Sequence, residues 1–123
     1  MNSFLLVFLG GGLGSVLRYG ISVMLKSTAT LFPVATLAAN GASSFVLGLI
    51  MGFLSAREGH TTPVTLFLAA GFCGGFSTFS TFSAETFEFL KHGQLSYALL
   101  NIAANLLICL VAIGAGMFLS KNF

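Results

Sequence analysis

The residues best suited to bind an ion without using charge lie between Gly71 and Ser83, where the sequence reads GFCGGFSTFSTFS. Two adjacent glycines precede five hydroxyl residues among the last seven positions, a composition that weakens a helix. Non-helical backbone inside a membrane is tolerated only when it is buried in protein or lines a watery cavity. We therefore favour a broken helix, whose freed backbone groups can hold an ion, over a flexible helix bonded by its own hydroxyls.

Two phenylalanines follow the expected break. Phe79 and Phe82 are three residues apart and share one face if the helix resumes there. The edge of an aromatic ring carries positive charge, and Ser80 and Thr81 between them can donate hydrogen bonds. Ring edges and neutral hydroxyls around a narrow path suit a small anion better than a cation. The alternative is that both rings simply pack in the core.

Three asparagines occur in otherwise apolar stretches. Asn40 follows the segment Thr36–Ala39, and its NH2 group could donate to an anion. Asn101 and Asn105 are four residues apart and so lie on one helix face. A buried amide is costly unless it is bonded. The pair could line an aqueous path or bond to a neighbouring helix, and the sequence leaves both possibilities open.

The elements that position these residues follow from the scarcity of charge. Only 7% of the 123 residues are charged and 56% are apolar, which excludes a soluble domain, and the net charge of +2 is too small for a nucleic-acid-binding surface. Four charge-free stretches each have room for one membrane span of about 20 residues. We predict an all-α membrane protein, a single four-helix domain over residues 1–123, with spans near 4–25, 33–54, 63–90 and 96–119.

Glycine spacing predicts where these helices touch. Small residues four apart allow membrane helices to approach closely. The pattern occurs three times, at Gly10 and Gly14, Gly48 and Gly52, and Gly71 and Gly75. Gly114 and Gly116 add a further small patch in the fourth span. We expect these positions to be helix–helix contacts.

The basic residues are almost evenly divided between the two sides of the membrane. Arg57 and Lys121 fall on the side of the termini, whereas Lys26, Lys91 and, if it reaches that far, Arg18 fall on the other. This balance gives little orientation bias. It allows either one weakly preferred orientation or dual topology, in which copies insert both ways and pair antiparallel. Because a bundle of four helices is too small to enclose a polar path alone, we expect an oligomer.

The segment from Gly71 to Ser83 resembles the signature of the CrcB/Fluc family of fluoride channels. The resemblance extends to residues 10–19 and to the stretch around Asn40, and so covers nearly the whole chain. It implies a fluoride-selective channel in a bacterial-type inner membrane that exports fluoride passively and lowers cytoplasmic fluoride. It also implies a third helix broken at mid-membrane and an antiparallel, dual-topology homodimer with two fluoride pathways.

The resemblance further implies roles for individual residues. Phe79 and Phe82 would supply ring edges to each pathway, and Asn40 would supply a hydrogen-bond donor. A structural sodium ion would lie at the dimer centre, held by the backbone carbonyls of Gly74 and Ser77 from both chains. Polar groups implied along the pathway are those of Ser80, Thr81, Asn101 and Asn105.

Two charged residues lie within the spans, and such residues are functional candidates. Arg18 could attract anions to a vestibule, pair with Glu85, or extend to the membrane interface, and a structural or anchoring role is favoured. For Glu85 the sequence leaves two roles open: an ion-pair partner for Arg18, or a residue that lines the pathway. Cys73 and Cys109 lie within spans and predict neither a disulfide nor a metal site.

Two other functions were weighed against a channel. A small multidrug-type proton-coupled exporter would need a carboxylate in the first span, which has none. A non-transporting membrane assembly subunit would explain the glycines but not the hydroxyl and phenylalanine segment. No nucleophile–base pair or metal-ligand cluster supports an enzyme.

Overall fold

The four apolar stretches form four helical segments in the computed structural model, which describes residues 2–26, 30–55 and 62–121. Each segment is long and apolar enough to cross a membrane, and no strand occurs in the described part of the chain. The prediction of a four-span all-α protein is therefore confirmed. Three segments are single helices: α1 (Ser3–Leu25), α2 (Val34–Ser55) and α6 (Leu95–Ser120).

The segment from Pro63 to Lys91 is made of several elements. It comprises α3 (Pro63–Thr65), the π-helical η1 (Leu66–Cys73), α4 (Gly74–Phe76) and α5 (Phe79–Lys91). Ser77 and Thr78 between α4 and α5 have extended backbone, with φ/ψ of −78°/156° and −147°/109°. An α-helix cannot continue through such angles. The regular hydrogen bonding of this segment is therefore interrupted after Phe76.

Two pairs of helices approach through glycine, as the spacing predicts. A Cβ atom at Gly10 or Gly14 of α1 would collide with the backbone of η1 and α4, and one at Gly75 with the backbone of Gly11. In the second pair, a Cβ at Gly48 of α2 would collide with α6, and one at Gly116 with α2. The prediction of helix–helix contacts is confirmed at these positions. Gly114 is the exception, because no other part of the described chain lies near it.

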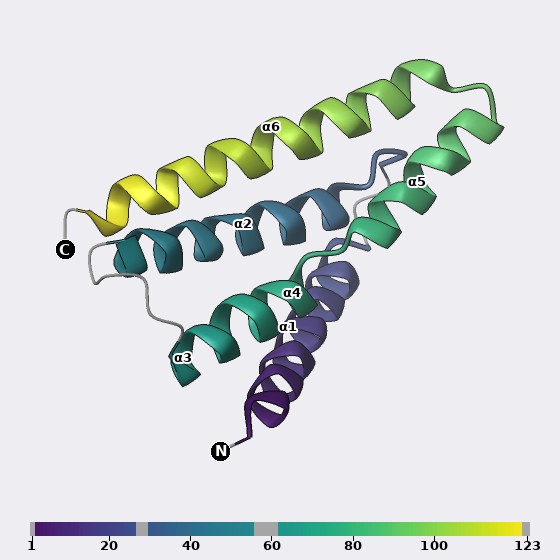
Figure 1. Ribbon diagram of the computed structural model, residues 1–123. Coiled ribbons are helices and arrows are strands. Elements are labelled where there is room, and N and C mark those ends of the chain that lie inside the picture. The colour runs from purple at the N-terminus through teal and green to yellow at the C-terminus, as the bar shows by residue number, and fades with distance from the viewer. Residues whose placement is uncertain (1, 27–29, 56–61, 122–123) are drawn as a thin grey trace.

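The third segment connects the two helix pairs. Its first half, η1 and α4, packs on α1, whereas α2 packs on α6 along its length and α5 packs on α6. Figure 1 shows α4 beside α1 and α5 leading away to the start of α6. The extended residues Ser77 and Thr78 lie where the chain passes from one pair to the other. The interruption therefore sits among three helices: α1, α2 and α6.

The chain termini, the helix ends and the lysines are divided between the two ends of the bundle. Figure 1 shows both termini and the end of α2 on one side, and the ends of α1 and α5 on the other. Lys26 and Lys91 end α1 and α5, and Lys121 follows α6 at the opposite side. Arg57, the remaining basic residue in the charge count, lies outside the described residues.

Many exposed side chains are apolar, and about half of the buried side chains are polar. Large apolar side chains are exposed along every span, including Phe4, Val16, Phe87 and Leu110. Polar side chains make up much of what is buried, namely Thr36, Asn40, Ser43, Thr86, Asn101, Asn105 and Ser120. Water would make such a distribution unfavourable, whereas lipid or a second copy can cover the apolar surface.

Candidate functional site

The side chain of Asn40 holds the interrupted backbone of the third segment. Its Oδ1 accepts a hydrogen bond from the Thr78 N–H at 2.7 Å, and its Nδ2 donates to the Thr78 carbonyl oxygen at 3.4 Å. Asn40 is 8% exposed, so these bonds replace helical partners in a place that little solvent reaches. The amide predicted as an anion donor therefore lies directly against the interruption.

Hydroxyl groups begin the helix that follows. Thr78 is the N-cap of α5, and its Oγ1 accepts from the Thr81 N–H at 3.3 Å. The same hydroxyl donates to Thr81 Oγ1 at 2.9 Å and lies 3.4 Å from Ser80 Oγ. Capping residues of this kind satisfy the free N–H groups at a helix start. The structure thus places Ser80 and Thr81 beside Thr78 in the first turn of α5.

Phe79 and Phe82 lie together on α5. Their ring centroids are 5.6 Å apart and the ring planes are inclined by 49°. The prediction that they share a helix face is confirmed. Phe79 is 79% exposed within a single chain, so this ring does not pack in the core of the chain. Its edge is free to meet an ion, lipid or another copy.

The three predicted amides form one connected network. Asn40 Nδ2 donates to Asn105 Oδ1 at 3.1 Å, and Asn105 Nδ2 donates to Asn101 Oδ1 at 3.0 Å. Asn101 Nδ2 in turn donates to Thr86 Oγ1 at 2.9 Å. Of the two possibilities left open by the sequence, the structure therefore shows bonding of Asn101 and Asn105 to neighbouring helices.

Arg18 reaches the same region from α1. Its Nε donates to the carbonyl oxygen of Gly75 at 3.3 Å, and Ser15 Oγ donates to the same oxygen at 3.4 Å. No ion pair between Arg18 and Glu85 occurs in the described ranges. Glu85 Oε1 instead accepts from Thr36 Oγ1 at 2.6 Å, while its Oε2 is buried and has no hydrogen-bond partner among the residues that the structure describes. Arg18 thus contacts the backbone just before the interruption.

A small cavity lies beside α4. Its volume is about 180 Å³, and it is lined by Ser43, Ser44, Leu47, Ala69, Cys73, Gly74 and Ser77. Ser43 Oγ and Ser77 Oγ both donate to the Cys73 carbonyl oxygen, at 2.9 and 3.1 Å. Among the described residues, no hydrogen bond reaches the carbonyl oxygens of Gly74 or Ser77. Carbonyl and hydroxyl oxygens are ligands suited to a hard cation, so the chemistry of these residues fits the sodium ion that the family resemblance implies.

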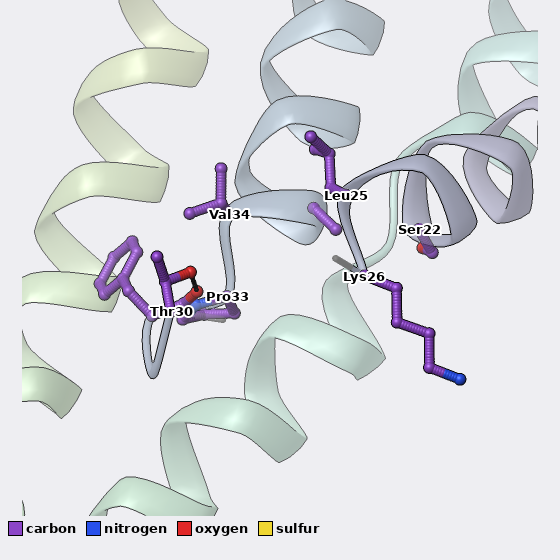
Figure 2. Close-up of a pocket in the computed structure, with 8 residues that line it drawn as sticks. Ser22, Leu25, Lys26, Thr30, Pro33 and Val34 are labelled. Atoms are coloured by element: carbon purple, nitrogen blue, oxygen red, sulfur yellow. Dashed lines mark hydrogen bonds between the residues drawn. The ribbon is translucent and has the colours of Figure 1, made fainter. Parts of the chain in front are cut away.

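A second pocket lies at the start of α2 and offers no comparable chemistry. It has a volume of about 220 Å³ and is lined by Ser22, Leu25, Lys26, Thr30, Phe32, Pro33, Val34 and Ala35. Figure 2 shows the Lys26 side chain extending away from Thr30 and Pro33. Thr30 Oγ1 donates to the Phe32 carbonyl oxygen at 3.2 Å. The polar groups therefore turn away or bond within the chain, and no ion site is assigned there.

Several residues of the site were not singled out from the sequence. Thr86 accepts from Asn101, Thr36 donates to Glu85, and Ser43 donates to the Cys73 carbonyl. A signal existed for Thr86, since a buried Asn101 needs a partner and the preceding helix carries few hydroxyls after Ser83. Thr36 and Ser43 carried no distinguishing spacing.

The fold and site define a class of protein. Four apolar helical segments, one of them interrupted, enclose a set of bonded amides and hydroxyls, which is the organisation of a multi-pass membrane protein with polar groups in its interior. The chain matches the family described as "CrcB-like protein, Camphor Resistance (CrcB)" over residues 5–117. The chain belongs to this family.

Named relatives match the chain over nearly its full length. A protein of Pyrococcus abyssi named "Fluoride-specific ion channel FluC" is 40% identical over 122 residues, which cover 99% of this chain and 98% of the relative. A Methylobacterium protein of the same name is 36% identical over 123 residues, covering 100% and 99%. A Yersinia pestis protein named "Fluoride-specific ion channel FluC 1" is 42% identical over 116 residues, covering 90% and 91%.

Proposed function

We propose that this chain is a fluoride-specific ion channel that lets fluoride leave the cell passively through the membrane. The observation that carries the proposal is the arrangement at the interruption, where the Asn40 amide and the hydroxyls of Ser80 and Thr81 gather at Thr78, the residue directly before the paired rings of Phe79 and Phe82. The names of the full-length relatives support it. A proton-coupled exporter is not favoured, because α1 carries no carboxylate.

The chemistry of this arrangement suits fluoride. Fluoride is small and strongly hydrated, so its water must be replaced by several short hydrogen bonds. Neutral amide and hydroxyl donors, together with positive ring edges, supply such contacts without a fixed countercharge. Conduction requires several sites that bind weakly enough to release the ion. A lysine or arginine along the narrow path would instead hold the anion tightly.

The proposed pathway follows the start of α5. Asn40, Ser80, Thr81 and the rings of Phe79 and Phe82 line it, and Asn105 borders it through its bond to Asn40. Asn101 has no exposed surface even within one chain, so we place it behind the lining. Glu85, bonded to Thr36, lies further along α5, and Arg18 supports the Gly75 carbonyl from α1.

The channel unit in this proposal is an antiparallel homodimer with dual topology, in which the interruption of the third segment lies at mid-membrane. Support comes from the outward-facing apolar side chains, among them Phe79, and from the near balance of basic residues between the two sides. Two inverted copies reproduce the symmetry that larger transporters build from inverted repeats. A bacterial-type inner membrane is the proposed location.

A structural sodium ion at the centre of this dimer is also proposed. The carbonyl oxygens of Gly74 and Ser77 from both copies would hold it, beside the hydroxyl-lined cavity at α4. When bound, the ion supplies fixed positive charge that raises the local electrostatic potential for a passing anion.

Fluoride release from liposomes tests the proposal. Purified protein reconstituted into fluoride-loaded liposomes should empty them down the fluoride gradient, while protein-free liposomes retain their contents. Chloride-loaded liposomes prepared with the same protein should stay loaded. Chloride release as fast as fluoride release, or no fluoride release at all, would contradict the assignment.

A further inference from the structure

We propose that Thr86 and Asn101 are positioning residues that act on the pathway through Asn105 and Asn40. The inference rests on the proposed fluoride conduction and adds to it a device that orients the anion-donating amide. Neither Thr86 nor Asn101 touches the pathway in this proposal. Their side chains are 8% and 0% exposed within one chain, and association with another copy can only bury them further.

The orientation of the network is determined at one backbone group. The Thr78 N–H can only donate, so the atom of Asn40 that faces it at 2.7 Å must be the oxygen Oδ1. The Nδ2 of the same amide then faces Asn105 and requires an acceptor there. A flipped Asn40 would set two donors against each other. The backbone at the interruption thereby determines which way this amide points.

The orientation of each following amide is determined by the hydrogen bond that it makes with the amide before it. Asn105 presents Oδ1 to Asn40, so its Nδ2 faces Asn101 and donates to Oδ1 and to the backbone carbonyl oxygen of that residue, at 3.0 and 3.1 Å. Asn101 must then direct its Nδ2 to another acceptor, which is Thr86 Oγ1 at 2.9 Å. Apart from the long contact of Asn40 Nδ2 with the Thr78 carbonyl oxygen, all three amides donate in the same direction, away from Thr78. Reversing any one of them would break the bonds on both of its sides.

The hydrogen-bond network begins at the residue before α5 and ends on α5 itself. Thr86 Oγ1 accepts from Asn101 and donates to the Phe82 carbonyl oxygen at 2.8 Å. One end of the network is therefore Thr78, just before α5, and the other is Phe82 on α5 itself. Phe79 and Phe82, the proposed ring edges, lie between or at these two anchor points. The network thus holds the donor amide and the ring-bearing turn in one fixed relation.

The geometry leaves one hydrogen of Asn40 available. One Nδ2–H is committed to Asn105 at 3.1 Å, whereas the contact with the Thr78 carbonyl oxygen, at 3.4 Å, is long. A hydrogen bond to an anion is stronger than one to a neutral carbonyl. The second N–H can therefore exchange its long hydrogen bond to the Thr78 carbonyl oxygen for one to fluoride, while the first keeps the amide in place. Loss of the Thr86 acceptor would remove the last anchor of this arrangement.

A pair of variants at Thr86 tests the inference. Thr86→Val has nearly the same shape but removes the hydroxyl that accepts from Asn101, and Thr86→Ser keeps that hydroxyl. Fluoride release from liposomes yields two separate numbers: the fraction of liposomes that empties, which counts assembled channels, and the rate for each channel. We expect Thr86→Val to lower the rate about tenfold at an unchanged fraction, because an Asn40 amide that is no longer held in place loses its hydrogen bond to the anion, which is a bond to a charged group. Thr86→Ser should restore the rate.

The outcomes separate this inference from the proposed function. If the parent protein conducts fluoride and both variants match it, or if serine slows the rate as much as valine, the positioning role is wrong and the channel assignment stands. A lower fraction of emptied liposomes at an unchanged rate for each channel would make Thr86 merely structural and would also overturn the inference. A parent protein that releases no fluoride would overturn both.

A measurement on the parent protein avoids dependence on the folding of a variant. Side-chain NH2 groups of Asn101 and Asn105, assigned by NMR in detergent micelles, should exchange hydrogen with solvent more slowly than that of Gln94, which is only partly buried. Exchange of both amides as fast as that of Gln94 would show that the network is not formed, and would contradict the inference whatever the flux results.

Discussion

The amide side chain of Asn40 is bonded to both polar groups of a single backbone residue, Thr78. The Thr78 N–H donates to Oδ1 at 2.7 Å, and Nδ2 donates to the Thr78 carbonyl oxygen at 3.4 Å. A side chain on α2 thereby takes the place of helical bonds that the third segment loses at Thr78, whereas the Ser77 N–H still donates to the Cys73 carbonyl oxygen. The Nδ2 that donates to the Thr78 carbonyl oxygen is also the group proposed to meet the anion.

This dual role predicts the behaviour of Asn40→Asp. The carboxylate keeps an acceptor for the Thr78 N–H but has no hydrogen to donate, and it places negative charge on the proposed pathway. We expect the fluoride release rate to fall at least about tenfold, the value of one hydrogen bond to a charged group. Elution of the variant at the same volume as the parent in size-exclusion chromatography would show that assembly is retained. An unchanged rate would remove Asn40 from the pathway.

Replacement of the ring edges is the second prediction. Phe79→Ile and Phe82→Ile keep bulk but remove the positive ring edge, so each should slow fluoride release from liposomes. Phe87→Ile is the matched control, because Phe87 lies on the same helix and is also exposed. We expect the control to conduct like the parent. Parental rates in both test variants would mean that the rings only pack.

Close helix approach predicts a contrast between two neighbouring glycines. A methyl group at Gly10 would collide with the Phe67 carbonyl oxygen and the Phe72 backbone, whereas one at Gly12 would meet nothing within 4 Å. Gly10→Ala should therefore cost about 1–3 kcal/mol through overpacking. Gly12→Ala should leave stability unchanged or raise it slightly. Thermal unfolding in detergent measures both, and equal midpoints would contradict the described contact between α1 and η1.

The contact of Arg18 with Gly75 predicts a structural effect that does not depend on salt. Arg18→Leu removes the charged donor to the Gly75 carbonyl oxygen, a bond worth about 1.5–3 kcal/mol. We expect a lower thermal midpoint and a slower fluoride rate by the same factor at low and high ionic strength. If Arg18 acts by attracting anions, its effect on the rate will instead disappear as salt screens the charge.

Dual topology predicts two populations of inserted chains. A reporter fused after residue 123 should be accessible from both sides of the membrane in the same cells. Adding lysines beside Lys121 should shift the population toward one orientation, since basic residues favour the cytoplasmic side, and should reduce fluoride export by depriving each copy of its inverted partner. A reporter found on one side only would exclude the antiparallel dimer.

Much of the fold could be predicted from the sequence because its causes are local. The ends of the four apolar helices lie within one residue of the predicted spans, since charge and length along the chain set where a helix can cross lipid. Glycines four apart mark contact faces because the absence of a side chain is itself what permits close approach. Gly114 shows the limit of the argument, for a small residue permits a contact but does not create one.

The partners of the polar groups could not be predicted in this way. The sequence by itself determined that Asn40, Asn101 and Asn105 sit in apolar surroundings and must find hydrogen bonds. Only the tertiary structure decided that the three amides bond to one another and to Thr86, that Glu85 bonds to Thr36, and that Arg18 reaches Gly75. Apart from the Asn105–Asn101 bond within α6, these pairings join different helices. They depend on which helix faces meet, and no local spacing contains that information.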